Sequence, residues 1–218
     1  MTAKPVLAVM ARWPSAGRCK KRLANDLSRL PLNHAGMRAA RLQQRLMDHT
    51  MAVAMSLRQQ GHVELALAVS GLAPRAARRW GHSVQADRTV LQRGGSLGCR
   101  LRHLLLAFQR SNQGRSVLVI GTDLPELNRH DLLVAVESLQ HRELVLGPAD
   151  DGGYWLIGLS SKLLTRPACW PFSGIPWGGS AVLESTLHFC QQAQLKTGLL
   201  PLRDDIDHLR DLKPWLSF

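Results

Sequence analysis

The stretch SVLVIGTDLP, residues 116–125, sets a short apolar run directly before a glycine and a carboxylate. A run of this length and composition is typical of a strand that is buried on both faces. The run stops at Gly121, so Asp123 follows at the carboxyl end of the strand. Ligands of open α/β sheets bind beyond the carboxyl ends of the strands. The stretch therefore predicts a buried strand and a place where chemistry can occur.

Similar runs lie on both sides of this strand and alternate with helical patterns. We predict further strands over residues 6–10, 63–70, 83–86, 143–146 and 195–202, with another apolar run over 154–159. Asn33 is expected to cap a long helix that ends near Arg58 and buries a methionine stripe including Met37, Met47 and Met51. Shorter helices are expected over 73–80, 99–111 and 130–139, within 177–192, and at 207–212. This alternation predicts an α/β fold with a mostly parallel central sheet and helices on both faces.

Composition limits the class of protein. The chain has 218 residues, which suits one domain spanning 1–218, and its 28 Lys and Arg against 16 Asp and Glu give a net charge of +12. Such a field attracts nucleotide phosphates or nucleic acid. The 4 cysteines form no CxxC pair, which argues against a zinc site and favours reduced thiols in the cytoplasm. No segment approaches the roughly 20 apolar residues of a membrane span.

A basic loop follows the first predicted strand. Its cations are Arg12, Arg18, Lys20, Lys21 and Arg22. A loop at the carboxyl end of a buried strand can present cations and backbone N–H groups to phosphate oxygens, and a glycine such as Gly17 lets the backbone approach a ligand closely. The loop is not a Walker A motif. The alternative is a solvated basic turn.

Three acidic segments could complete a site. Asp123 could bind Mg²⁺ or Mn²⁺, or cap a turn. Asp205 and Asp207 lie two residues apart, so on an extended segment they point the same way and could complete the coordination; Asp207 could instead cap a terminal helix. The segment Asp150-Asp151-Gly152-Gly153-Tyr154 could line the rim of the pocket or form a tight hairpin turn.

Taken in order, several segments resemble the DUF2064 family of GT-A-type nucleotide-diphospho-sugar transferases, which includes members assigned to arsenosugar biosynthesis. They are ARWPSAGRCKKRL (11–23), similar to the family's A-K-x-P-x-x-G-x-x-K-T-R-L, GSLGCRL (95–101), GTDLP (121–125), GPADDGGYWLIGL (147–159), IPW (175–177) and DID (205–207). The resemblance spans about residues 5 to 213. Two departures are Arg12, where the family has lysine, and Lys21, where it has threonine. Arginine keeps the charge but not the compact geometry of lysine.

The resemblance implies a Rossmann-like GT-A fold, a nucleotide-sugar donor and a divalent cation, Mg²⁺ or Mn²⁺. It places Asp123 as the metal ligand beside the diphosphate, and it likens Asp205 and Asp207 to the late metal-associated D-x-D of related nucleotidyltransferases. Gly17, Arg18, Lys20 and Arg22 would then cradle phosphate.

The complete predicted site has three parts. The catalytic residues are Asp123, Asp150 and Asp151; the substrate-binding residues are Arg12, Pro14, Gly17, Arg18, Lys20, Arg22, Gly98, Thr122, Gly152, Gly153 and Tyr154; the metal ligands are Asp123, Asp205 and Asp207.

The expected reaction is metal-dependent transfer of a sugar from a nucleotide-diphosphate donor to a small acceptor. One alternative is a nucleotidyltransferase that joins a nucleoside triphosphate to a phosphorylated small molecule and releases pyrophosphate. A lower-ranked alternative is a nucleic-acid-binding module. Beyond donor and acceptor, a second copy of the chain is a candidate partner, whereas nucleic acid is not expected as one.

Overall fold

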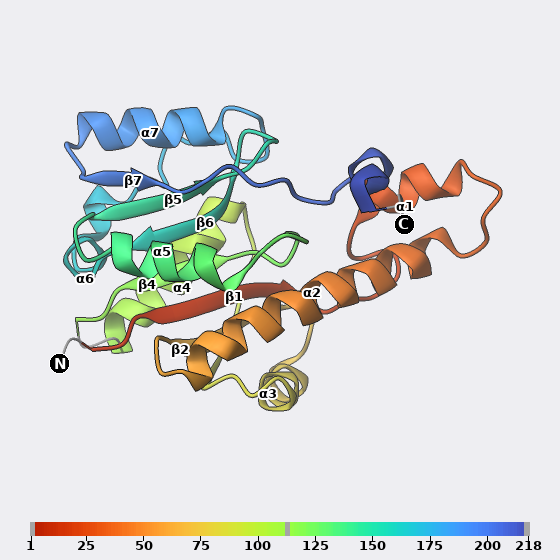
Figure 1. Ribbon diagram of the computed structural model, residues 1–218, viewed down its shortest axis with the longest axis horizontal. Helices are drawn as coiled ribbons and strands as arrows, with labels where there is room; N and C mark the ends of the chain where they lie inside the picture. The colour runs from red at the N-terminus through yellow and green to blue at the C-terminus, as the bar shows by residue number, and fades with distance from the viewer. Residues whose placement is uncertain (1–2, 112–113, 216–218) are drawn as a thin grey trace.

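A computed structural model describes residues 3–111 and 114–215 and shows a seven-stranded sheet with helices on both faces (Figure 1). In chain order the elements are β1 (Val6–Arg12), α1 (Lys21–Ser28), α2 (Ala35–Gln59), β2 (Glu64–Ser70), α3 (Pro74–Ser83), β3 (Arg88–Leu91), α4 (Leu97–Ser111), β4 (Val117–Ile120), α5 (Arg129–Ser138), β5 (Leu144–Pro148), β6 (Tyr154–Leu159), α6 (Ser161–Leu164), η1 (Pro167–Cys169), α7 (Val182–Gln192), β7 (Thr197–Leu199) and η2 (Leu209–Trp215).

The strand order confirms the predicted α/β class. The strands follow the order β3-β2-β1-β4-β6-β5-β7, and β6 runs antiparallel to both of its neighbours while the other pairings are parallel. From β1 the chain builds outward to β2 and β3, and it then returns to place β4 on the other side of β1. The carboxyl ends of β1 and β4 therefore form a topological switch point, where ligands of such sheets bind.

Two hydrophobic cores enclose the sheet. Alternate residues of β1 face opposite sides, so Leu7 and Val9 join one core while Val6 and Ala8 join the other. The first core is closed by α2, α3 and α5, and the second by α4, α6 and α7. Burial on both faces explains why β1 and β4 are apolar runs without alternation. Among the helices of the described residues, none combines the length and the apolar character needed to cross a bilayer.

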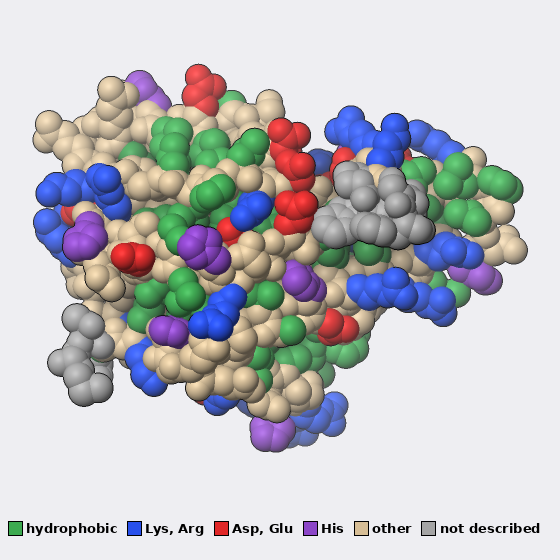
Figure 2. Space-filling view, viewed as in Figure 1, with side chains coloured by type: hydrophobic (Ala, Val, Ile, Leu, Met, Phe, Trp, Pro, Cys, Tyr) green, Lys and Arg blue, Asp and Glu red, His purple; other side chains and the backbone are tan. Residues whose placement is uncertain are grey.

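Helix α1 and the first half of α2 form an arm beyond the end of the sheet (Figure 1). A small third core holds this arm together, in which Leu23 and Leu27 of α1 pack on Ala39 of α2. Leu209 and Leu212 of η2 pack against the same core. Figure 2 shows Lys and Arg side chains over much of the arm and Asp and Glu side chains where the arm meets the sheet. Helix α1 was not predicted from the sequence, where the basic loop was expected to extend to Arg22.

Three local predictions were wrong. Residues 83–86 do not form the third strand, because α3 continues to Ser83 and the edge strand β3 begins at Arg88. The N-cap of α2 is His34, in a left-handed conformation with φ of 64° and no side-chain cap bond, instead of Asn33. Met37 is exposed because it lies on the arm, beyond the sheet that covers Met47 and Met51.

Candidate functional site

A cavity of about 670 Å³ opens at the carboxyl ends of β1 and β4. Most of the predicted site residues line it: Arg12, Arg18, Lys20, Arg22, Thr122, Asp123, Asp151, Gly153, Tyr154, Asp205 and Asp207. The cavity lining does not include Pro14, Gly17, Gly98, Asp150 or Gly152, which belong to the neighbouring loops and to α4. The structure thus brings together residues from both halves of the chain at the switch point.

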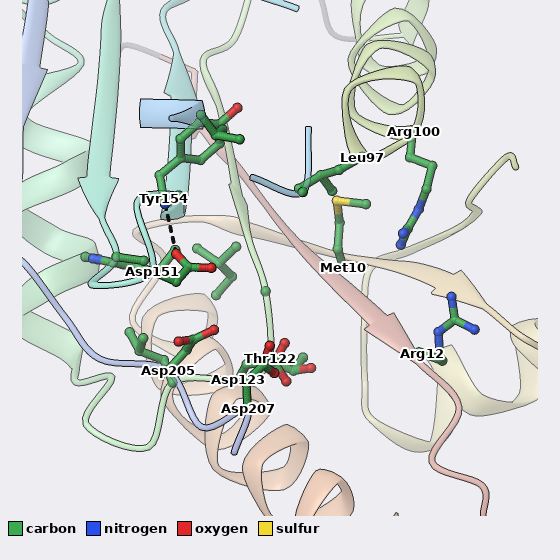
Figure 3. A pocket seen from close by; sticks show the side chains of 18 of the residues that line it. Met10, Arg12, Leu97, Arg100, Thr122, Asp123, Asp151, Tyr154, Asp205 and Asp207 are labelled. Atoms are coloured by element: carbon green, nitrogen blue, oxygen red, sulfur yellow. Dashed lines mark hydrogen bonds between the residues drawn. The ribbon is translucent and has the colours of Figure 1, made fainter. Parts of the chain in front are cut away.

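The end of β4 holds Thr122 and Asp123 in the cavity wall (Figure 3). Thr122 is buried, and its hydroxyl accepts a 2.9 Å hydrogen bond from Nε2 of the buried Gln43. Gln43 comes from α2, so this bond links α2 to the cavity wall at the end of β4. Gln43 could not be recognised from the sequence, because a polar residue in a helix gives no sign of where its side chain points.

Lys20 is the most unusual cation of the cavity. Its backbone is left-handed, with φ of 46°, and its side chain is only 2% exposed. The ammonium lies 2.6 Å from Oδ1 of Asp123 and 3.2 Å from Oδ1 of Asp207, and it also donates to the carbonyl oxygen of Ile206. Burial alone lowers the pKa of Lys20, but the two carboxylates outweigh it and the net pKa is raised. Lys20 is thus a buried cation fixed between two acids.

Backbone hydrogen bonds bring the late acidic segment to β4. The N–H of Ile206 donates to the carbonyl of Asp123 at 3.1 Å, and Ile206 itself is buried. Asp205 and Asp207, on either side of it, both line the cavity. Burial, together with the nearby charges of Asp207 and Asp151, raises the pKa of Asp205 to about 6. This end of the cavity therefore carries more negative charge than its one buried lysine balances.

The segment between β5 and β6 forms a hairpin turn, and part of it also lines the cavity. In this turn, Oδ1 of Asp151 accepts from the N–H of Gly153 at 2.8 Å. Gly152 has φ of 83°, and a Cβ there would lie 1.9 Å from the carbonyl oxygen of Ser180, so only glycine fits. Asp151 nevertheless lines the cavity, whereas Asp150 is exposed outside it.

Aromatic side chains form another wall. Tyr154 and Trp177 make an edge-to-face contact with ring centroids 6.2 Å apart, and both line the cavity. Burial raises the pKa of the Tyr154 hydroxyl. Gly98 supports this wall from behind, because a Cβ at that position would lie 2.2 Å from Nε1 of Trp177. The glycine at residue 98 is therefore required by the packing of an indole ring.

Arg12 and Arg100 line the side of the cavity opposite the carboxylates. In Figure 3 they lie apart from the aspartates, with Met10 and Leu97 between the two groups. Arg100 was not among the predicted site residues. The signal that could have found it is its place in the glycine motif GSLGCRL, one turn into α4.

The carboxylates offer the oxygen donors that Mg²⁺ and Mn²⁺ prefer, yet this arrangement does not fit a bound metal. The ammonium of Lys20 lies between Asp123 and Asp207, where a cation between these two ligands would lie. Within residues 3–111 and 114–215, no three His, Cys, Asp or Glu side chains are grouped closely enough to hold a metal ion. The predicted metal-binding role of these aspartates stays a prediction.

Comparisons with known proteins place the chain in a family and a fold. The family model described as "Uncharacterized protein conserved in bacteria (DUF2064)" matches residues 50–179. No curated protein matches the chain.

Solved structures share the fold at low identity. A "putative nucleotide-diphospho-sugar transferase" from Desulfovibrio desulfuricans G20 is 24% identical, with a TM-score of 0.78 over 98% of this chain and 86% of that one. The inositol-1-phosphate CTP transferase from T. maritima is 14% identical, with a TM-score of 0.58 over 98% and 94% of the two chains. Rv0371c from Mycobacterium tuberculosis H37Rv, in complex with manganese, is 18% identical, with a TM-score of 0.54 over 98% and 99%. These likenesses show the fold.

Proposed function

The chain belongs to the DUF2064 family, and we propose that it is a transferase that uses a nucleotide-diphosphate sugar as donor and a small molecule as acceptor. The observation that carries this proposal is the cavity at the β1 and β4 switch point, which is lined by both cations and carboxylates. Its volume of about 670 Å³ lies in the range of small-molecule sites. The fold shared with the protein from Desulfovibrio desulfuricans G20 supports the same class of donor.

The proposed step is glycosyl transfer. A hydroxyl oxygen of the acceptor bonds to the anomeric carbon of the sugar while the bond from that carbon to the β-phosphate oxygen breaks. The nucleoside diphosphate leaves with the electron pair, and the hydroxyl proton passes to a carboxylate. Asp151 is our candidate for the proton acceptor because it lines the cavity, whereas the adjacent Asp150 does not.

The cations of the cavity suit the departing diphosphate. Fixed charges aimed at a developing negative charge are often the largest catalytic contribution, because they need no reorganisation during the reaction. Arg12, Arg18 and Arg100 all line the cavity. The Tyr154 and Trp177 wall offers ring faces and edges on which a base or a sugar could pack.

Mg²⁺ or Mn²⁺ remains our predicted cofactor, although no step above depends on it. Bound manganese in Rv0371c, which shares the fold, supports the prediction for this chain. Asp123 and Asp207 would coordinate a metal between them only after the ammonium of Lys20 had moved away. Binding experiments should therefore be run with and without metal.

Nucleotidyl transfer on the same site is the second candidate. It is favoured by the shared fold with the inositol-1-phosphate CTP transferase from T. maritima. The products separate the two reactions, since glycosyl transfer releases a nucleoside diphosphate and nucleotidyl transfer releases pyrophosphate.

Calorimetric titration tests the proposal. Nucleoside diphosphates and triphosphates are titrated into wild-type protein with and without Mg²⁺ or Mn²⁺, and into the variants Asp123→Ala, Asp151→Asn and Asp150→Asn. We expect nucleotide to bind wild type, with an unchanged affinity in Asp150→Asn, which serves as the control outside the cavity. Asp123→Ala should bind more weakly only when metal is present, because a carboxylate attracts phosphate only through a cation. Turnover by Asp151→Asn should fall while nucleotide binding persists. A folded wild-type protein that binds no nucleotide would exclude both enzyme functions.

A further inference from the structure

Arg12 and Arg100 come from different elements and meet on one side of the cavity. Arg12 ends β1, and Arg100 lies in the first turn of α4. The backbone N–H of Arg100 donates to the carbonyl oxygen of Ser96 at 3.0 Å. Figure 3 shows the two guanidinium groups turned toward each other. Burial, with the like charge of Arg12, lowers the pKa of Arg100. Two positive groups are thus held together at a cost in free energy.

A neutral side chain holds Arg100 in this place. Nε of Arg100 donates to Oε1 of Gln92 at 3.0 Å, and its terminal nitrogen donates to the same oxygen. Gln92 is fixed in turn, because its Nε2 donates to the carbonyl oxygens of Ala11 at 3.2 Å and Ala68 at 2.6 Å. Gln92 therefore orients the guanidinium without neutralising it, and other N–H groups of the fork stay available to a ligand.

The two arginines also differ from Lys20 and Arg22, while Arg18 and Lys21 line the cavity as exposed side chains. Lys20 and Arg22 each form an ion pair with Asp207. Within the part of the chain that the structure describes, no carboxylate forms an ion pair with Arg12 or Arg100. Arg100 is half-buried and Arg12 is exposed beside it. Convergent charges of one sign without a counterion are stabilised when an anion binds between them.

The start of α4 adds a second attraction for an anion. Its first residue, Leu97, lines the cavity. The hydroxyl of Ser96, directly before it, accepts a 3.3 Å hydrogen bond from the backbone N–H of Cys99. A helix N-terminus carries partial positive charge and unpaired N–H groups. Helix dipole and guanidinium groups therefore act on the same region of the cavity.

We propose that Arg12 and Arg100 form the subsite that binds the phosphate groups of the nucleoside diphosphate, apart from the end of the cavity where Lys20 meets the aspartates. This inference rests on the proposed function. It moves the expected phosphate site away from Lys20 and Arg22, where the sequence placed it. Lys20 and Arg22 are already paired with aspartates. The arginine pair offers phosphate oxygens a convergent positive charge, and Gln92 holds Arg100 in place. A guanidinium fork matches two phosphate oxygens at once.

The test uses the full chain with inorganic pyrophosphate and with nucleoside diphosphates as probes, in buffer containing EDTA. The variants are Arg12→Gln and Arg100→Gln, with Arg110→Gln as the matched control, because Arg110 lies on the exposed face of α4 outside the cavity. We expect both cavity variants to bind pyrophosphate at least about tenfold more weakly than wild type, since each loses charge-assisted hydrogen bonds. The Arg110→Gln affinity should equal that of wild type.

Thermal unfolding separates lost binding from lost folding. Arg100→Gln without ligand should unfold at the wild-type temperature or above it, because a poorly compensated charge has been removed, and pyrophosphate should raise the Tm of wild type but not of this variant. Arg12 is exposed, so Arg12→Gln keeps the fold in any case.

The outcomes distinguish the subsite from the enzyme function. Wild-type affinity for pyrophosphate in both cavity variants, or no binding by wild type, would overturn the subsite. If nucleoside diphosphates bind wild type and both variants equally, the transferase function stands and the subsite fails. If pyrophosphate binds through the arginines but no nucleotide binds, the subsite stands and the function fails.

Discussion

The two ends of the cavity hold their cations in opposite ways. At one end, Lys20 is buried between Asp123 and Asp207, and its charge is balanced within the protein. At the other, Arg12 and Arg100 face each other with only the neutral Gln92 bound to Arg100. The first arrangement gives the buried ammonium of Lys20 two carboxylate partners, which stabilises the fold. The second arrangement leaves positive charge that a bound anion can neutralise. Counting basic residues in the sequence does not separate these roles.

Removing the charge at Lys20 should have the largest effect. Lys20→Met keeps the apolar stem but leaves Asp123 and Asp207 without their shared partner. We expect the free energy of unfolding to fall by about 2–3 kcal/mol, less than for a fully buried pair because both aspartates are partly exposed. Urea unfolding at pH 7 measures it. A wild-type midpoint would show that the paired end does not stabilise the fold.

A packing change at the arginine end should cost somewhat less. Gly98→Ala places a methyl group against the ring of Trp177, where the unrelaxed Cβ would lie 2.2 Å from Nε1. Such overpacking destabilises by about 1–3 kcal/mol. Because no charge is involved, the loss should be the same in low and high salt, whereas the loss in Lys20→Met should shrink in high salt. An equal salt response in the two variants would contradict the contrast drawn between the two ends.

The pH dependence of stability probes the acidic end. The pKa of Asp205 is raised from 3.8 to about 6 in the folded chain, so the native state holds a proton that the unfolded state has lost between these values. Stability from this group therefore falls as pH rises from about 4 to 6. Asp205→Asn should be more stable than wild type at pH 7, by about 1–2 kcal/mol after allowance for partial exposure, and less sensitive to pH.

Urea unfolding at pH 5 and pH 7 in EDTA checks this, with the exposed neighbour variant Asp204→Asn as control. Parallel pH profiles for wild type and Asp205→Asn would show that ionisation of Asp205 does not destabilise the folded chain.

The smallest effect is expected at Arg22, which shares Asp207 with Lys20. Its guanidinium lies 3.1 Å from Oδ2 of Asp207, but its side chain is 61% exposed. Arg22→Gln should change the free energy of unfolding by no more than about 0.5 kcal/mol. A loss as large as that of Lys20→Met, in the same unfolding series, would mean that burial does not decide which ion pair matters.

Much of the fold could be predicted because its signals are local. The apolar runs of β1 and β4 mark strands buried on both faces, and the alternation with helices predicts their parallel pairing. The errors fall where local signals are weak. Helix α1 shows only Leu23 and Leu27, one turn apart, among charged residues. The edge strand β3 is half-buried and resembles the preceding polar residues in composition.

The site was predicted unevenly for a related reason. Asp123 could be located because it directly follows a buried strand, and Asp205 and Asp207 could be paired because residues two apart on an extended segment share a side. Asp150 and Asp151 are adjacent and identical in type, and only the turn geometry sends one of them into the cavity. No spacing rule distinguishes such neighbours.

The sequence by itself therefore determined the class of sheet and the presence of cations after the first strand and an acid after the fourth, because buried strands are runs of consecutive apolar residues. The switch point between β1 and β4 follows from the strand order, which only the structure gives. Only the tertiary structure decided which cation meets which acid. Lys20 reaches Asp207 across 187 positions of chain. Arg12 lies near Arg100 because the end of β1 and the start of α4 meet at the cavity. Contacts between such distant residues leave no periodic pattern in the sequence. The difference between the end where Lys20 is paired and the end where Arg12 and Arg100 have no carboxylate partner therefore arises only on folding.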